Sequence, residues 1–215
     1  MCSVAVIIRG VVNEDKKMET IISHYVPSEW QTSNVYNFNK PIEYDIPTHN
    51  SLYEQLSRKV SGNFNLGVTR ITRVENRHLY GLFLINKEEY ESRGFTVVKE
   101  LYHDTGRDKV QNILNKNLDR RYAHRVKYGR GVSFSPNPNY ANQESSRHNG
   151  TSRAMIVADV LVHQYETVYS TVDLPSQGCD TTIGNDGQVY VKYYDNEFYP
   201  KFVIYYNSRN RGFRF

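Results

Sequence analysis

The sequence has only two cysteines, Cys2 and Cys179, among its 215 residues. This scarcity excludes the disulfide framework that stabilises small secreted domains, and it excludes a zinc site made of several thiolates. The seven histidines are scattered and lack the close spacing of a zinc-binding pair. We therefore expect an intracellular protein, cytoplasmic or nuclear, that binds no metal.

Long apolar runs are also missing. The run near the amino terminus, Val4 to Ile8, is interrupted by Arg9 and is far shorter than the roughly 20 residues that cross a bilayer. It lacks the basic start and the small-residue cleavage site of a secretory signal. We expect a strand here and no membrane partner.

Common nucleotide-binding and hydrolase signatures are absent: there is no P-loop, no Gly-x-Gly-x-x-Gly and no Gly-x-Ser-x-Gly. The net charge of +4 is within the range of ordinary soluble proteins and identifies no partner. What the chain has is 18 Tyr and 9 Phe, which indicate a folded, aromatic-rich protein. Its length predicts one domain. The motifs place that domain at residues 26–215, after a segment 1–25 to which the sequence gives no role.

Helix signals lie mainly in the first half of the chain. Asn50 or Ser51 can cap a helix over 52–60, where apolar residues recur every four positions. A second helix is expected after Asn76. A third is expected over about 108–114.

Strand signals continue to the end of the chain. Residues 68–74 alternate apolar and polar side chains, which predicts a strand buried on one face. Residues 154–162 are apolar and β-branched, which predicts a central strand. A short β-rich run occupies 95–98, and 189–194 and 201–206 are two strand candidates with a turn between them. Helices early and strands late predict the α+β class.

Two stretches of the chain, Leu101–Thr105 and Tyr128–Ser135, resemble the pocket of PARP-type ADP-ribosyltransferases. In that family a strand ending in His-Gly-Thr or His-Gly-Ser leads to a Tyr-Gly-Lys-Gly-x-Tyr-Phe-Ala strand. Further segments resemble the CCCH-zinc-finger branch, which contains mono-transferases and the zinc-finger antiviral protein: 25–30, 73–80, 174–176 and 198–204. The resemblance implies an ADP-ribosyltransferase fold, with two packed, mainly antiparallel sheets and flanking helices.

The resemblance also implies NAD as co-substrate, with no metal: nicotinamide leaves and a nucleophile captures the ribose. His103 is then expected to bond a ribose hydroxyl, and the backbone of Asp104 to hold the carboxamide. Thr105 is expected to be a supporting hydroxyl. The alternatives are a structural histidine at the strand end and a helix-capping threonine.

Gly129 and Gly131 flank Arg130, which stands where the family has Lys. Close approach of the backbone to the ligand or to a neighbouring strand would require these glycines, and so would a β-bulge. Arg130 can equally be a solvated surface charge. Tyr140 aligns with the family's Ala-x-Tyr-Ser segment, which puts Ala141 where the family has a Ser that contacts the nicotinamide amide.

Three departures from the family pattern affect the expected chemistry. Asp104 replaces a Gly and adds a carboxylate near the carboxamide position, narrowing the approach. Ser133 replaces a Tyr that packs on nicotinamide. Val189 stands where polymerising members have Glu, so the triad reads His-Ser-Val and chain elongation is not expected.

The sequence thus favours a mono-ADP-ribosyltransferase that acts on a protein acceptor, itself included, with nucleic acid as a weaker candidate. The alternative is a catalytically silent PARP-like pseudoenzyme that serves as a binding or scaffold module. A third, less favoured reading is a binder of ADP-ribose or nucleic acid through the basic, aromatic residues 207–215.

Overall fold

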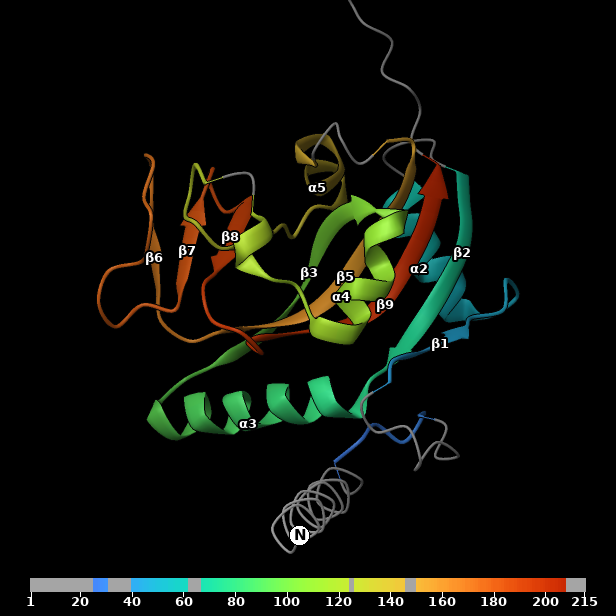
Figure 1. The fold of residues 1–215 in the computed structure, drawn as a ribbon, viewed down its shortest axis with the longest axis horizontal. Coiled ribbons are helices and arrows are strands. Elements are labelled where there is room, and N and C mark those ends of the chain that lie inside the picture. Colours follow the sequence, from blue (N-terminus) through green and yellow to red (C-terminus); the bar gives the residue numbers. More distant parts are fainter. Residues whose placement is uncertain (1–24, 31–39, 62–66, 124–125, 146–149, 208–215) are drawn as a thin grey trace, which may run out of the picture.

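Two mainly antiparallel sheets, which lie side by side in Figure 1, form the framework of the protein. The computed structural model describes residues 25–30, 40–61, 67–123, 126–145 and 150–207. The predictions for 1–24 and 208–215 lie outside these ranges. The first sheet has the strand order β1 (Ile42–Asp45), β2 (Gly67–Glu75), β9 (Phe198–Asn207), β5 (Ser152–Val162) and β3 (Val97–Gly106). The second has the order β4 (Val132–Phe134), β8 (Val189–Lys192), β7 (Thr181–Gly184) and β6 (Tyr165–Thr167). The predicted α+β class is confirmed.

Strand β5 carries the core of the first sheet on both of its faces. Ala154 and Ile156 pack with α4 (Val110–Lys116), which lies in front of the sheet in Figure 1. Met155 and Val157 pack with α2 (Ser51–Ser61), which lies behind it. Each large apolar side chain buried in this way contributes about 1.5–3 kcal/mol. The expected central strand is confirmed.

The predicted helix caps are present. The side chain of Asn50 accepts a hydrogen bond from the backbone N–H of Leu52 at 2.9 Å. Asn76 caps α3 (Arg77–Arg93) by accepting from the N–H of Leu79 at 3.0 Å, and its amide donates to the carbonyl of Leu114 at 2.9 Å. Asn76 therefore also ties α3 to α4. None of the helices in the described part of the chain combines the length and apolar character of a membrane span.

Several predicted boundaries were wrong. The second half of the β-rich run at 95–98 and the motif after it form the single strand β3, which begins at Val97. The prediction that the strand at 68–74 is buried on one face only was also wrong. In the second half of β2 both faces are covered: Thr72, a polar residue of the expected alternation, is fully buried, and its hydroxyl donates to Glu43 at 2.8 Å. The third helix begins at Val110, after a 3₁₀ turn over Arg107–Lys109. Strand β8 ends at Lys192 and belongs to a different sheet from β9. The elements β6, β7 and α5 (Pro138–Glu144) were not predicted.

The two sheets meet where β3 passes β4. The N–H of Tyr102 donates to the carbonyl of Ser135 at 2.8 Å, and the N–H of Ser135 donates to the carbonyl of Tyr102 at 2.9 Å. This short bridge brings together the two sequence stretches that carry the family resemblance.

Candidate functional site

A cavity of about 960 Å³ lies where β3 meets β4. This volume is at the upper end of the range for small-molecule sites, so it has room for a ligand larger than a single ring. The predicted site residues that line it are His103, Asp104, Thr105, Gly131, Ser133, Tyr140 and Val189. Gly129 does not line it.

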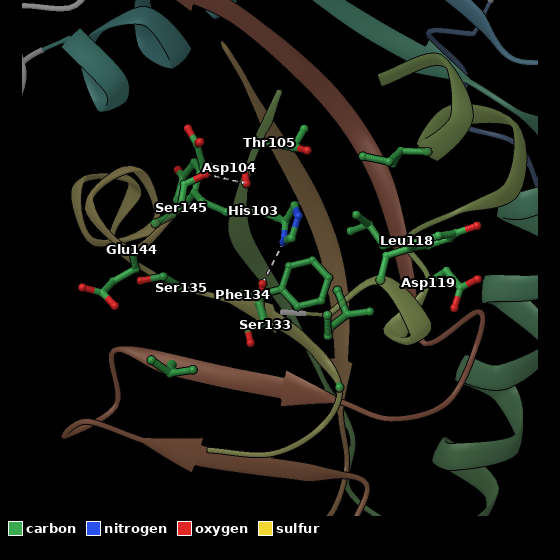
Figure 2. Close-up of a pocket in the computed structure, with 18 of the residues that line it drawn as sticks. His103, Asp104, Thr105, Leu118, Asp119, Ser133, Phe134, Ser135, Glu144 and Ser145 are labelled. Atoms are coloured by element: carbon green, nitrogen blue, oxygen red, sulfur yellow. Dashed lines mark hydrogen bonds between the residues drawn. The ribbon is translucent and has the colours of Figure 1, made fainter. Parts of the chain in front are cut away.

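The ring of His103 is fixed at the wall of this cavity (Figure 2). Its Nδ1 lies 2.9 Å from the carbonyl oxygen of Ser133, and its ring meets the Phe134 ring edge-on with centroids 5.9 Å apart. Because a carbonyl can only accept, Nδ1 carries the hydrogen. Burial lowers the pKa of His103, which keeps the imidazole neutral. Nε2 is therefore a hydrogen-bond acceptor, and no partner for it occurs in the described part of the chain.

The backbone of Asp104 lies beside His103, on an edge of β3 where no strand of the described part of the chain pairs with it. The N–H and carbonyl of Tyr102 face β4, and residues two apart in a strand direct their backbone groups to the same side. The N–H and carbonyl of Asp104 therefore also point away from β5. The Ser145 hydroxyl donates to this carbonyl at 3.3 Å, which leaves the second lone pair of the oxygen. A donor and an acceptor side by side match the two halves of a primary carboxamide.

The carboxylate of Asp104 points the other way, to the opposite face of β3 from His103. It is 1% exposed and accepts hydrogen bonds from Arg153, from the Tyr206 hydroxyl and, at 3.5 Å, from the Asn142 amide. The expectation that this carboxylate narrows the approach to the cavity was wrong, because these partners hold it on the far side. Burial raises the pKa of Asp104 to about 6, although the Arg153 guanidinium acts in the opposite direction.

The remaining predicted residues are distributed around the same cavity. Thr105 is buried and caps no helix, since the 3₁₀ turn that follows has Gly106 at its N-cap without a side-chain cap bond. Ser133 and Val189 line the wall next to β8, and Val189 offers no hydrogen-bonding group there. Tyr140 and Ala141 come from α5 on the side where Figure 2 shows Glu144 and Ser145.

The two glycines are required by close approach to β8 and to the residue that follows it. A Cβ atom on Gly129, whose φ is 138°, would lie 1.8 Å from the Tyr193 hydroxyl. A Cβ on Gly131 would lie 2.3 Å from the Lys192 carbonyl oxygen. Of the alternatives for these glycines, the geometry favours the strand contact, and a direct contact with a ligand stays a prediction. Arg130 is 61% exposed and lies 3.6 Å from Asp173, as a solvated surface charge would.

Sequence reasoning missed the residues that hold α5 in place. Asn137 accepts from the N–H of Asn139 at 2.9 Å and Pro138 occupies the first turn, so this Asn-Pro pair is a recognisable helix start. The contact of Arg153 with Asp104 left no such signal. These residues are 49 positions apart, and only the pairing of β3 with β5 brings them together.

No model of a known protein family matches the chain.

Proposed function

We propose that the protein is a mono-ADP-ribosyltransferase with the ADP-ribosyltransferase fold. It transfers ADP-ribose from NAD to a protein acceptor, itself included, and releases nicotinamide. The observation that carries this proposal is the backbone edge of Asp104, which pairs with no strand among the described residues, beside the acceptor atom Nε2 of His103. One cavity thus offers a carboxamide-binding edge and a group that can hold a ribose hydroxyl.

These groups act by orienting the reactants. The Asp104 N–H donates to the carboxamide oxygen and the Asp104 carbonyl accepts from the carboxamide NH₂. His103 Nε2 accepts the hydrogen of a ribose hydroxyl, and Thr105 supplies a further hydroxyl at the wall. With the reactants fixed, the bond between ribose and nicotinamide breaks with its electron pair going to nicotinamide. An acceptor nucleophile bonds to the same carbon and loses its proton.

The wall formed by Ser133 and Val189 restricts the reaction to one transfer. Val189 is 7% exposed and cannot accept a hydrogen bond from the hydroxyl of a previously attached ADP-ribose. A growing chain would therefore find no group to position its end. Ser133 provides no ring to stack on nicotinamide, so recognition depends on the Asp104 edge.

A second candidate function is a catalytically silent PARP-like module that serves as a scaffold. The observation that favours it is the Ser145 hydroxyl, which already bonds the Asp104 carbonyl at 3.3 Å. Ala141 also lacks the hydroxyl expected at its position. The cavity of about 960 Å³ favours the transferase, because a silent module has no need to keep this space open.

The test is self-labelling. Incubation with NAD is expected to add the mass of ADP-ribose to the intact protein, as measured by mass spectrometry. His103→Ala should reduce labelling about 100-fold, because misplacing a reactant has effects of this size. His163→Ala is the matched control, since His163 contacts the Phe95 carbonyl at 3.1 Å and does not line the cavity. Authentic NAD binding without any labelling would refute the proposal.

A further inference from the structure

Positive charge is concentrated in a segment beside the cavity. The charged side chains of this segment that line the cavity itself, Asp108, Lys109, Asp119 and Lys127, balance one another, so its excess positive charge lies outside the lining. The segment that we call the cationic wall comprises residues 107–123 and 126–130, and several of its residues line the cavity. It contains two aspartates and seven basic residues: Arg107, Lys109, Lys116, Arg120, Arg121, Lys127 and Arg130. This short stretch has a larger positive charge than the +4 of the whole chain. Residues 131–145, on the other side of the cavity, contain Glu144 and no Lys or Arg.

The basic residues of the cationic wall also differ in their pairing. Elsewhere most described basic side chains have a carboxylate within 4.0 Å: Arg58, Lys59, Arg70, Arg73, Lys87, Arg93, Arg153, Lys192 and Lys201. On the cationic wall, Arg121 pairs with Asp119 and Arg130 with Asp173. Four exposed members have no carboxylate at that distance among the described residues: Arg107, Lys116, Arg120 and Lys127. Arg107 lies instead over the Tyr205 ring, with its guanidinium carbon 5.0 Å from the ring centre. Clustered like charges repel one another, so basic groups without a carboxylate partner suit a polyanionic partner.

Aromatic rings accompany these charges. Tyr122 lines the cavity and is 70% exposed, and the Nζ of Lys127 lies 5.0 Å from the centre of the Tyr128 ring. An exposed ring beside basic side chains is the combination on which bases of single-stranded nucleic acids stack while their phosphates are neutralised. An acidic peptide would use the charges but not the exposed ring. The aromatic component therefore favours nucleic acid.

We infer that the cationic wall binds a single-stranded nucleic acid, with phosphates along Arg107, Lys116 and Arg120 and a base on Tyr122 at the mouth of the cavity. The inference goes beyond the proposed transfer and does not depend on it. NAD also contains phosphates, but Arg107, Lys116 and Arg120 do not line the cavity. Binding of a strand and binding of NAD can therefore be tested separately.

The experiment is a fluorescence anisotropy titration of the full chain with a labelled single-stranded RNA of about 15 nucleotides. The wall variant combines Arg107→Gln, Lys116→Gln and Arg120→Gln. The matched control combines Arg58→Gln, Lys87→Gln and Arg93→Gln, which removes the same charge from surface ion pairs on α2 and α3. We expect the wall variant to bind the RNA at least about tenfold more weakly than the wild type. The slope of the logarithm of its binding constant against the logarithm of the salt concentration should be smaller by about 2, because each contact with a single-strand phosphate contributes about 0.7 to this slope. The control should bind like the wild type.

A second pair of variants tests stacking. Tyr122→Ala is expected to weaken RNA binding about fivefold or more, the size of one lost base–aromatic contact. Tyr169→Ala, which removes a tyrosine that is 84% exposed outside the cavity, should leave binding unchanged. A polyglutamate peptide that binds as tightly as the RNA, together with unchanged RNA binding by Tyr122→Ala, would overturn the inference in favour of an acidic peptide.

A calorimetric titration of the wall variant with NAD separates this inference from the proposed function. Unchanged NAD binding with lost RNA binding supports the inference. RNA binding that fails in the wild type, or falls equally in the wall variant and the control, overturns it while leaving the transferase proposal intact. Strong RNA binding by a protein that does not bind NAD would support the inference and refute the transferase.

Discussion

The two sides of the cavity are built differently. The basic side chains of the cationic wall are exposed, and four of them have no carboxylate within 4.0 Å among the described residues. The opposite side, which we call the closed wall, comprises β3 from Tyr102 to Thr105 together with residues 131–145. There the Asp104 carboxylate is buried and bonded to Arg153, Tyr206 and Asn142. The difference teaches that buried, paired charges fix the geometry of the closed wall, whereas the exposed charges of the cationic wall suit the polyanionic partner proposed for it.

The largest expected effect comes from breaking the closed wall at Arg153. Arg153→Met leaves the buried Asp104 carboxylate without its cation, which should cost about 3–5 kcal/mol of unfolding free energy, measured by urea denaturation. Lys87→Met is the control, because Lys87 forms a surface pair with Glu91 at 2.8 Å that contributes at most about 0.5 kcal/mol. Adding Asp104→Asn to Arg153→Met should recover part of the loss. A loss below about 1 kcal/mol for Arg153→Met would show that the closed wall does not depend on this ion pair.

The pH dependence of stability sharpens the same comparison. The pKa of Asp104 is raised from 3.8 to about 6 in the folded protein, so the folded state binds the proton more tightly than the unfolded state. The stabilisation from this proton is complete below about pH 4 and is lost as the pH rises through 6. The unfolding free energy of the wild type minus that of Asp104→Asn should therefore fall by about 2–3 kcal/mol between pH 4 and pH 7. Parallel stability curves for the two proteins would contradict the burial of this carboxylate.

The smallest expected effect concerns Ser145, at the edge of the closed wall. Ser145→Ala removes the hydroxyl that donates to the Asp104 carbonyl at 3.3 Å. Stability should fall by about 0.5–1 kcal/mol, and the affinity for nicotinamide should rise about twofold to fivefold because the hydroxyl no longer competes with the carboxamide for the Asp104 carbonyl. Ser176→Ala is the control. It removes a hydroxyl that donates to Glu166 at 2.7 Å, neither residue lines the cavity, and the affinity for nicotinamide should not change. Weaker nicotinamide binding by Ser145→Ala would show that this hydroxyl belongs to the binding site.

The sequence predicted best the features that depend on neighbouring residues. The caps at Asn50 and Asn76 and the apolar run of β5 were recognisable because each depends on residues a few positions apart. Strands β6 and β7 were missed because they are three and four residues long and contain polar side chains.

The direction of the site side chains could not be predicted, because it depends on strand register. The motif placed His103 and Asp104 next to each other, but the pleat of β3 sends the imidazole into the cavity and the carboxylate to the other face. The partner of that carboxylate, Arg153, is set by the pairing of Asp104 with Met155 across β3 and β5. No local pattern in the sequence contains this information.

The most direct test of the central claim, that the Asp104 backbone edge recognises a carboxamide, is a calorimetric comparison of nicotinamide with nicotinic acid. The carboxylate of nicotinic acid has two acceptor oxygens and cannot donate to the Asp104 carbonyl. We predict that nicotinamide binds at least about tenfold more tightly, since an unmet buried acceptor costs about 1–3 kcal/mol. Equal affinities for the two compounds, or no binding of nicotinamide, would contradict the account.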